Sequence, residues 1–369
     1  MIKKYLLIFA ISFLFAEGIY AQIKGKKPDR IIKIGLLLND KTSNSAKNGA
    51  KLAIEIANKL EEASGTHFEL VVRSMEGPWG TGSKEAVNLV FNEKVWAILG
   101  SHDGRNAHLV EQVIAKTHIV FLSAWATDPT LYQAFVPWFF SVVPNDYQQA
   151  EILAKEISNT NKRYKIAALS DQSYDSDLAL QSFLKKMNKM EYSEIIQMNY
   201  NNTDKSFKEI NHNINKNNID CVVLFSESSS LIPLLKQLEK NTNVKHVYGV
   251  LSLLANDWQI EKDFKQFQTV SIISYPNRLN NKESSFLKSY KEKYSKRPGA
   301  VAVYAYDGMN LILEVIRNSN FNRDKIQETM AKVKFNGVTG SIQFDEHGSR
   351  LNTAELINLN NRIPVIKEN

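Results

Sequence analysis

The chain contains 369 residues, carries a formal net charge of +7 and has a single cysteine, Cys221. Domains usually contain about 100 to 200 residues, so this length favours two of them. One cysteine excludes a disulfide-rich scaffold, and we expect Cys221 to be buried and unreactive in an apolar strand. The positive charges alternate with acidic residues along predicted helices instead of forming a basic stripe, so we expect no nucleic-acid partner.

The first 21 residues predict a signal peptide for export. Lys3 and Lys4 precede an apolar run from Tyr5 to Ala16, and the small residue Ala21 stands at the expected cleavage point. A membrane-spanning helix needs roughly 20 apolar residues, so a membrane anchor is the less favoured alternative. Because export without disulfides is typical of a bacterial periplasm, we expect the mature protein to act there.

From Ile31 onward, short apolar runs alternate with segments of helical periodicity. The pattern predicts strands over residues 31–38, 68–74, 95–100 and 117–123, with helices over 45–62, 83–91 and 105–116 between them. Strands that alternate with helices form parallel sheets with helices on both faces. We therefore expect one doubly wound α/β lobe in this part of the chain.

The same alternation restarts after residue 149. Strands are predicted over 165–170, 194–200, 221–227 and 246–252, with helices over 178–190, 206–217 and 231–239. A strand over 269–277 then precedes helices over 284–296, 301–317 and 323–333, and hairpin signals occupy 340–350 and 353–367. This second series predicts a second doubly wound lobe.

The order of these elements, together with five motifs, resembles the type I periplasmic solute-binding proteins, in particular the branched-chain amino acid and amide binders of ABC transporters. GSHDGRN (100–106) stands where that family has a Gly-Pro-x-x-Ser-Gly loop, and FLSAWATDPTL (121–131) matches its ISPSATNPAL signature. DQSYD (171–175) corresponds to the family's Asp-x-x-Tyr-Gly. AYDGMN (305–310) and FNGVTGSIQFDEHG (335–348) match its Ala-Tyr-Asp-Ala helix and its final turn.

The resemblance implies an α/β fold of two doubly wound parallel-sheet lobes joined by three crossovers, with the solute in the cleft between them. Carried over to this chain, lobe one comprises residues 31–143 and 277–333, and lobe two comprises 144–276 and 334–369. The implied function is that of a periplasmic receptor, a monomer that closes on a small polar ligand such as an amino acid, an amide or a carboxylate. It would deliver this ligand to the membrane permease of an ABC importer. A sensor with the same lobes and no transport role is the main alternative.

Two loops at the carboxyl ends of neighbouring predicted strands form the candidate ligand site. In doubly wound sheets, ligands bind at this edge, where a helix N-terminus presents unpaired N–H groups. Gly104 allows close approach to the backbone, and the hydroxyl groups of Ser123 and Thr127 can point into the cleft, together with the backbone N–H groups around Ala126. Such a site suits a carboxylate or another small polar group.

Departures from the family pattern bear on which ligand is bound. Gly104 replaces a serine that holds the amino acid backbone in relatives, and the next residue, Arg105, either pairs with a carboxylate, lies over an aromatic ring or points to water. Trp125 replaces a small residue, so it either narrows the pocket or forms a wall for the ligand. Leu251 stands where amino acid binders place an acid; Glu227 is the candidate substitute, or else a helix cap.

Two tyrosines complete the expected ligand-binding set. Tyr174 matches the cleft tyrosine of the family, and the alternative is a tyrosine packed within lobe two. Tyr306 lies in the hinge helix motif, although Tyr304 is two residues away and can take its place.

The histidines of residues 100–108 raise two enzymatic or metal-binding alternatives. A zinc site is disfavoured because His102 and His108 are six residues apart and no third ligand is near in sequence. A hydrolase built on Ser101, His102 and Asp103 is disfavoured because neighbouring side chains splay apart around a turn. The simpler interpretation is that Asp103 caps the next helix and both histidines are solvated. We therefore expect no metal, no cofactor and no enzymatic activity.

Overall fold

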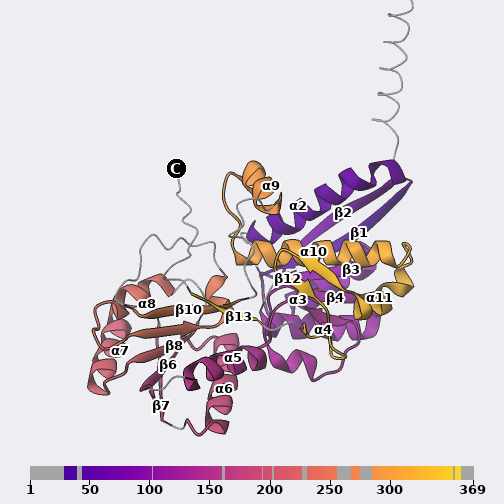
Figure 1. Cartoon of the computed structure of the whole chain (residues 1–369). Helices are drawn as coiled ribbons and strands as arrows, with labels where there is room; N and C mark the ends of the chain where they lie inside the picture. The colour runs from indigo at the N-terminus through magenta and orange to yellow at the C-terminus, as the bar shows by residue number, and fades with distance from the viewer. Residues whose placement is uncertain are drawn as a thin grey trace, which may run out of the picture.

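The computed structural model describes residues 29–39, 44–101, 103–159, 163–192, 194–201, 203–226, 231–255, 267–274, 285–351 and 354–358. These residues form two α/β lobes, each with its own sheet (Figure 1). The predicted signal peptide lies outside the described residues. Within the described part of the chain, no helix is both long and apolar enough to cross a membrane.

The first sheet has five strands in the order β2-β1-β3-β4-β5, and every pairing in it is parallel. Its strands are β1 (Arg30–Leu38), β2 (Thr66–Ser74), β3 (Ala97–Ser101), β4 (Val120–Ser123) and β5 (Phe139–Ser141). All four side chains of β4 are buried, and so are residues 34–38 of β1. Strands that are apolar on both sides need helices on both faces of the sheet.

Those helices come from distant parts of the chain. On one face, α2 (Asn44–Glu61) packs along α10 (Ala300–Asn318), and on the other lie α3 (Thr81–Val87) and α4 (Gly104–Thr117). A Cβ atom at Gly49 of α2 would lie 2.1 Å from the carbonyl oxygen of Ala302, so only glycine permits this close approach of α2 to α10. Further helices at this lobe are α9 (Ser285–Tyr294) beside α2 and α11 (Ile326–Lys332) beside α10.

The second sheet has six strands in the order β13-β10-β9-β8-β6-β7. They are β6 (Ile166–Ser170), β7 (Ile195–Asn199), β8 (Cys221–Phe225), β9 (His246–Gly249), β10 (Thr269–Ser274) and β13 (Glu355–Asn358). All pairings are parallel except that of β13 with β10. One face is covered by α5 (Asp146–Ser158) and α6 (Tyr174–Lys189), and the other by α7 (Asp204–Lys216) and α8 (Leu231–Leu238).

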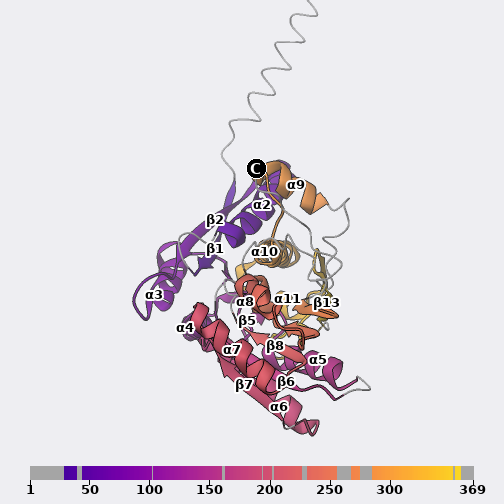
Figure 2. The ribbon, with the colours of Figure 1, turned by 90° about the vertical axis from the view of Figure 1, so that its left-hand side faces the viewer.

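Short elements complete the two lobes. The strands β11 (Phe335–Gly337) and β12 (Gly340–Ile342) form a hairpin that packs on α10. Turns of 3-10 helix occur at η1 (Glu62–Ser64), η3 (Pro129–Tyr132), η5 (Leu251–Leu254) and η7 (Arg323–Lys325), and a π turn, η2 (Asn88–Asn92), follows α3. Figure 2 shows the lobes from the side, with α2 and β2 toward the upper end and α6 and β7 toward the lower end.

The expected fold of two doubly wound lobes is confirmed, with differences in detail. The three-residue strand β5 and the helix α5 have no counterpart among the sequence-based predictions. Within the segment 340–350, where a hairpin was expected, Phe344 and Arg350 form an isolated antiparallel bridge across a tight turn, and β12 pairs with β11. The strand β13 crosses to the second sheet and pairs with β10. The positions of β5 and β13 depend on pairing between segments that local periodicity does not connect.

Two of the chain segments that run between the lobes are held together by a buried arginine. Residues 142–145 lead from β5 to α5, and residues 343–354 lead from β12 toward β13. Arg350, 1% exposed, donates hydrogen bonds to the carbonyl oxygens of Val142 (3.0 Å), Thr339 (3.1 Å) and Ser341 (2.7 Å). These bonds hold the two segments side by side at the junction of the lobes.

Candidate functional site

The first lobe contributes two loops at the carboxyl ends of β3 and β4. After β3, the side chain of Asp103 accepts a hydrogen bond from the N–H of Asn106 at 2.8 Å and thereby caps α4, as the sequence predicted. After β4, the chain runs through residues 124–128 to η3. The two loops touch at Gly104, because a Cβ atom there would lie only 2.5 Å from the Cβ of Asp128. Only a glycine fits at the start of α4.

The second lobe contributes the N-terminus of α6, which meets α4 across the cleft. The N–H of Gly104 lies 3.1 Å from both carboxylate oxygens of Asp175. Next to it, the hydroxyl of Tyr174 donates to Oδ2 of Asp128 at 3.1 Å, and the Arg105 guanidinium lies 4.9 Å from the centre of the Tyr174 ring. Residues 104–105 and 174–175 therefore join the lobes directly.

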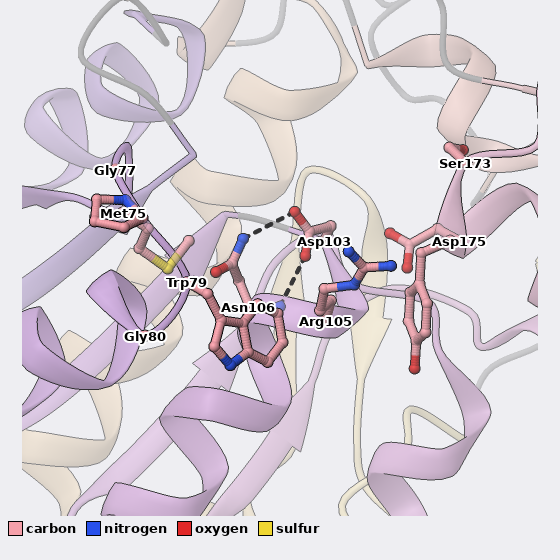
Figure 3. Close-up of a pocket in the computed structure, with 11 residues that line it drawn as sticks. Met75, Gly77, Trp79, Gly80, Asp103, Arg105, Asn106, Ser173 and Asp175 are labelled. Atoms are coloured by element: carbon pink, nitrogen blue, oxygen red, sulfur yellow. Dashed lines mark hydrogen bonds between the residues drawn. The ribbon is translucent and has the colours of Figure 1, made fainter.

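A cavity of about 320 Å³ opens beside these contacts and is lined by both lobes. Figure 3 shows Arg105 between Trp79 on one side and Asp175 on the other. The indole of Trp79 is 72% exposed, and its ring centre lies 5.9 Å from the Arg105 guanidinium. The lining residues from the first lobe are Met75, Gly77, Pro78, Trp79, Gly80, Asp103, Arg105 and Asn106, and those from the second are Ser173, Tyr174 and Asp175.

Arg105 is held in this cavity by aromatic rings instead of a carboxylate. Among the described residues, no acidic side chain comes within ion-pair distance of its guanidinium, although both Asp103 and Asp175 line the same cavity. Stacking of a guanidinium on aromatic faces stabilises it while leaving its N–H edges available for hydrogen bonds. Of the three roles that the sequence left open for Arg105, the structure shows the aromatic one.

Asp128 is the centre of a buried charge network behind the cavity. It is 0% exposed, and it accepts hydrogen bonds from Nε2 of His108 at 3.0 Å and from the Thr130 hydroxyl at 2.6 Å. Burial alone would raise the pKa of Asp128, but the hydrogen bonds from His108 and Thr130 outweigh burial, and the pKa is lowered. Asp128 is therefore ionised. It also accepts a hydrogen bond from the hydroxyl of Tyr174 in the opposite lobe.

His108 is a structural cation, and the expectation that it is solvated is wrong. Its Nδ1 lies 3.2 Å from Oε2 of Glu111, while its Nε2 faces Asp128 and Thr130. The hydrogen bonds to Asp128 and Glu111 raise the pKa of His108 to about 9. Helical periodicity places His108 at a polar position of α4 but does not reveal that the loop after β4 packs over it.

A second buried acid, Asp146, lies at the start of α5. It is 1% exposed; its N–H donates to the Thr127 carbonyl at 2.9 Å, and its Oδ1 accepts from Nε2 of Gln149 at 3.1 Å. Burial raises the pKa of Asp146 well above its usual range, and the nearby carboxylates of Asp175 and Asp128 raise it further. Burial at the junction of the lobes therefore favours the neutral form of Asp146.

Four of the expected site residues lie at the end of β4 and in the loop that follows it. Thr127 and Ala126 are buried in the loop after β4, and Trp125 is half-buried there, with its ring edge toward Tyr304 at 5.9 Å. Ser123 is 0% exposed, and its hydroxyl accepts a hydrogen bond from the Ala126 N–H at 3.1 Å, so it supports the turn.

Tyr306 lies apart from these loops. It packs on Phe286 of α9 with ring centres 4.3 Å apart, on the side of α10 that faces α2 and α9. The alternative, Tyr304, is the tyrosine that contacts Trp125, and its hydroxyl lies 3.0 Å from that of Ser274 at the end of β10. The structure therefore brings Tyr304, and not Tyr306, to the junction of the lobes.

Glu227, a candidate ligand-binding residue, and His102, considered for metal binding and hydrolysis, lie outside the described residues. Leu251 stands at the position where an acid was expected from the family pattern. It is fully buried, and its N–H donates to Oε1 of Gln149 at 2.8 Å.

Sequence reasoning missed two acids that the structure places at the centre of the site, Asp128 and Asp175. A signal existed for Asp175, because DQSYD ends in an acid where the family motif has glycine. Its significance depends on which amide lies opposite, and only the structure shows that this is the N–H of Gly104.

Comparison with known proteins agrees with this geometry. The model of the periplasmic binding protein family matches residues 32–356. The structure of the branched-chain amino acid transporter substrate binding protein LivJ from Streptococcus pneumoniae, in complex with isoleucine, is 20% identical and has a TM-score of 0.74. That comparison covers 91% of this chain and 99% of the other. It shows a common fold.

Comparison by sequence found relatives that include a plant receptor and a bacterial binding protein. Glutamate receptor 3.4 of Arabidopsis thaliana is 22% identical over 370 residues, covering 87% of this chain and 38% of the receptor. The Leu/Ile/Val-binding protein BraC3 of Rhizobium johnstonii is 25% identical over 180 residues, which is 48% of each chain. The matched region thus spans less than half of either relative. Because the family model matches most of the sequence and the two lobes have the expected topology, the chain belongs to the periplasmic binding protein family.

Proposed function

We propose that this protein is a solute receptor that binds a small polar ligand between its lobes and delivers it to the membrane permease of an ABC importer. The observation that carries this proposal is the cavity of about 320 Å³, which is lined from both lobes next to direct contacts between them. Pockets for small molecules commonly occur at such interfaces and measure roughly 300 to 1,000 Å³. The volume suits a ligand the size of an amino acid or a simple aromatic molecule.

The groups around the cavity define how such a ligand is held. Arg105 offers N–H donors, and Trp79 offers an exposed flat apolar surface. We propose that Thr127 and Trp125, in the loop after β4, contact the ligand from the first lobe. Ligand binding then shifts the balance between open and closed forms, since only a closed cleft lets both lobes touch the ligand.

We propose that the protein acts in the periplasm, after residues 1–21 have directed its export and have been cleaved off. This part of the proposal is supported by the family to which the chain belongs and by the pattern of charged, apolar and small residues at the N-terminus.

A ligand screen tests the proposal. The purified mature protein is heated with amino acids, amides, small carboxylates, alcohols and aromatic acids, each alone. A true ligand at 100 times its dissociation constant should stabilise the protein by about 2.7 kcal/mol. Calorimetric titration then measures affinity, and mass spectrometry of the mixture should recover the ligand chemically unchanged. Conversion of the ligand into a product that stops in His102→Ala would instead support the hydrolase alternative.

A sensor without a transport role is the second candidate. The similarity to plant glutamate receptors favours it, because in those receptors the matched region is one part of a longer chain. Deleting the neighbouring permease genes and measuring uptake of the identified ligand separates the two functions. Loss of uptake supports import, and normal uptake with a lost transcriptional or signalling response supports sensing.

A further inference from the structure

The N-terminus of α4, which is the natural anion site of the first lobe, already holds carboxylates of this chain. The Gly104 N–H donates to both oxygens of Asp175 at 3.1 Å, and the Asn106 N–H donates to Oδ1 of Asp103 at 2.8 Å. Helix N-termini attract negative charge because their first N–H groups lack partners within the helix. Here one of the two carboxylates comes from the opposite lobe.

The fit of Asp175 against this helix depends on the glycine. A Cβ atom at position 104 would lie 2.9 Å from Oδ1 of Asp175 and 3.0 Å from Oδ2 of Asp128. Any other residue would push Asp175 away from the amide or force Asp128 to move. The pairing of a glycine at residue 104 with an acid at residue 175 is therefore a matched feature of the two lobes.

The neighbouring residues strengthen this contact. The hydroxyl of Tyr174 donates to Asp128 at 3.1 Å, and the guanidinium of Arg105 lies 4.9 Å from the Tyr174 ring centre. Residues 104 and 105 of α4 thus meet residues 174 and 175 of α6 through a charge-assisted hydrogen bond and a cation–π contact, and Tyr174 adds a hydrogen bond to Asp128 in the loop after β4. None of these contacts requires a ligand.

We propose that Asp175 takes the place of a ligand carboxylate at the N-terminus of α4, closing the lobes without a ligand and selecting ligands whose head group is neutral or cationic. This inference rests on the proposed function. A ligand carboxylate at the same amide would have to displace Asp175 and would then lie close to the ionised Asp128, where like charges repel. An amide, alcohol or amine meets no such repulsion.

Scattering without any ligand tests the closing role. The variants are Asp175→Ala and Asp175→Asn, and the matched control is Asp177→Asn, which makes the same chemical change two residues further into the first turn of α6. Asp177 accepts a hydrogen bond from Ser170 within its own lobe at 3.0 Å, so it does not join the lobes. We expect a larger radius of gyration for Asp175→Ala, an intermediate one for Asp175→Asn, and no change for the control. Identical scattering from Asp175→Ala and the wild type would overturn the closing role.

Paired probes of equal shape test the selectivity. Benzoate with benzamide, and leucine with leucinamide, are titrated into the wild type and the same three variants. We expect the wild type to bind each amide at least about 10-fold more tightly than its acid, and Asp175→Ala to gain about 10-fold or more in affinity for the acids. The control should keep the wild-type preference.

The role of Asp175 and the proposed receptor function are refuted by different results. If the wild type prefers the acids, or if Asp175→Ala gains no affinity for either acid, the role of Asp175 in selection is wrong even when the protein proves to be a receptor. If no solute of any class binds the wild type, the proposed function is wrong, while the scattering comparison still decides whether Asp175 closes the lobes.

Discussion

Replacing His108 with glutamine should make the stability of this protein less dependent on pH. In the folded chain, His108 bonds to the buried Asp128 and to Glu111, and its pKa is raised from 6.5 to about 9. The folded state therefore holds the imidazole proton more tightly than the unfolded chain does. The resulting stabilisation is complete below pH 6.5 and is lost as the pH rises through about 9.

The magnitude follows from the two pKa values. A tenfold difference in proton affinity corresponds to about 1.4 kcal/mol, so the difference between 6.5 and about 9 sets an upper limit of about 3.4 kcal/mol. The His108 side chain is 31% exposed, and solvent screening reduces the value. We expect about 1 to 2 kcal/mol. The lowered pKa of Asp128 describes the same contact from the other partner and is not counted again.

Urea unfolding at pH 6 and pH 9.5 measures this contribution. His108→Gln should be less stable than the wild type at pH 6, and the gap should shrink by about 1 to 2 kcal/mol at pH 9.5. His212→Gln, a change at an exposed position of α7, serves as the control and should show the same gap at both pH values. An equal loss of stability in His108→Gln at both pH values would show that the charge of His108 contributes nothing.

Three other predictions concern the hinge, the loop after β4 and the core. Arg350→Met should lower the free energy of unfolding by about 3 to 5 kcal/mol, because it removes a 1%-exposed guanidinium from several buried carbonyl groups; a melting temperature close to that of the wild type would contradict this. Thr127→Ala should weaken the best ligand by about 1 to 3 kcal/mol in calorimetric titration. Unaltered affinity would remove this loop from the site. The Cys221 thiol is 0% exposed and burial raises its pKa, so Ellman's reagent should label it only in denaturant, and rapid labelling of the native protein would refute its burial.

Much of the fold is predictable because it depends on which faces of each segment are buried. Residues 34–38 are apolar and buried throughout, and they belong to β1, an interior strand of a sheet that has helices on both faces. The helix expected over 105–116 is α4, whose inward positions Leu109, Val110, Val113 and Ile114 are all buried. Where local pattern was weak, prediction failed. The strand β5 has three residues, and its place in the sheet depends on β4 beside it.

The site was less predictable than the fold for a physical reason. The sequence alone pointed to the loops at the ends of β3 and β4, to the cap at Asp103 and to Tyr174 on the far side of the cleft, because motif and strand-end position are properties of short segments. Only the tertiary structure decided what these groups meet. Gly104 and Asp175 are separated by 71 residues, and Tyr174 and Asp128 by 46. Such contacts depend on how two separately folded lobes come together, which no local periodicity encodes, and they determine whether the N-terminus of α4 is open to a ligand or already occupied by the chain itself.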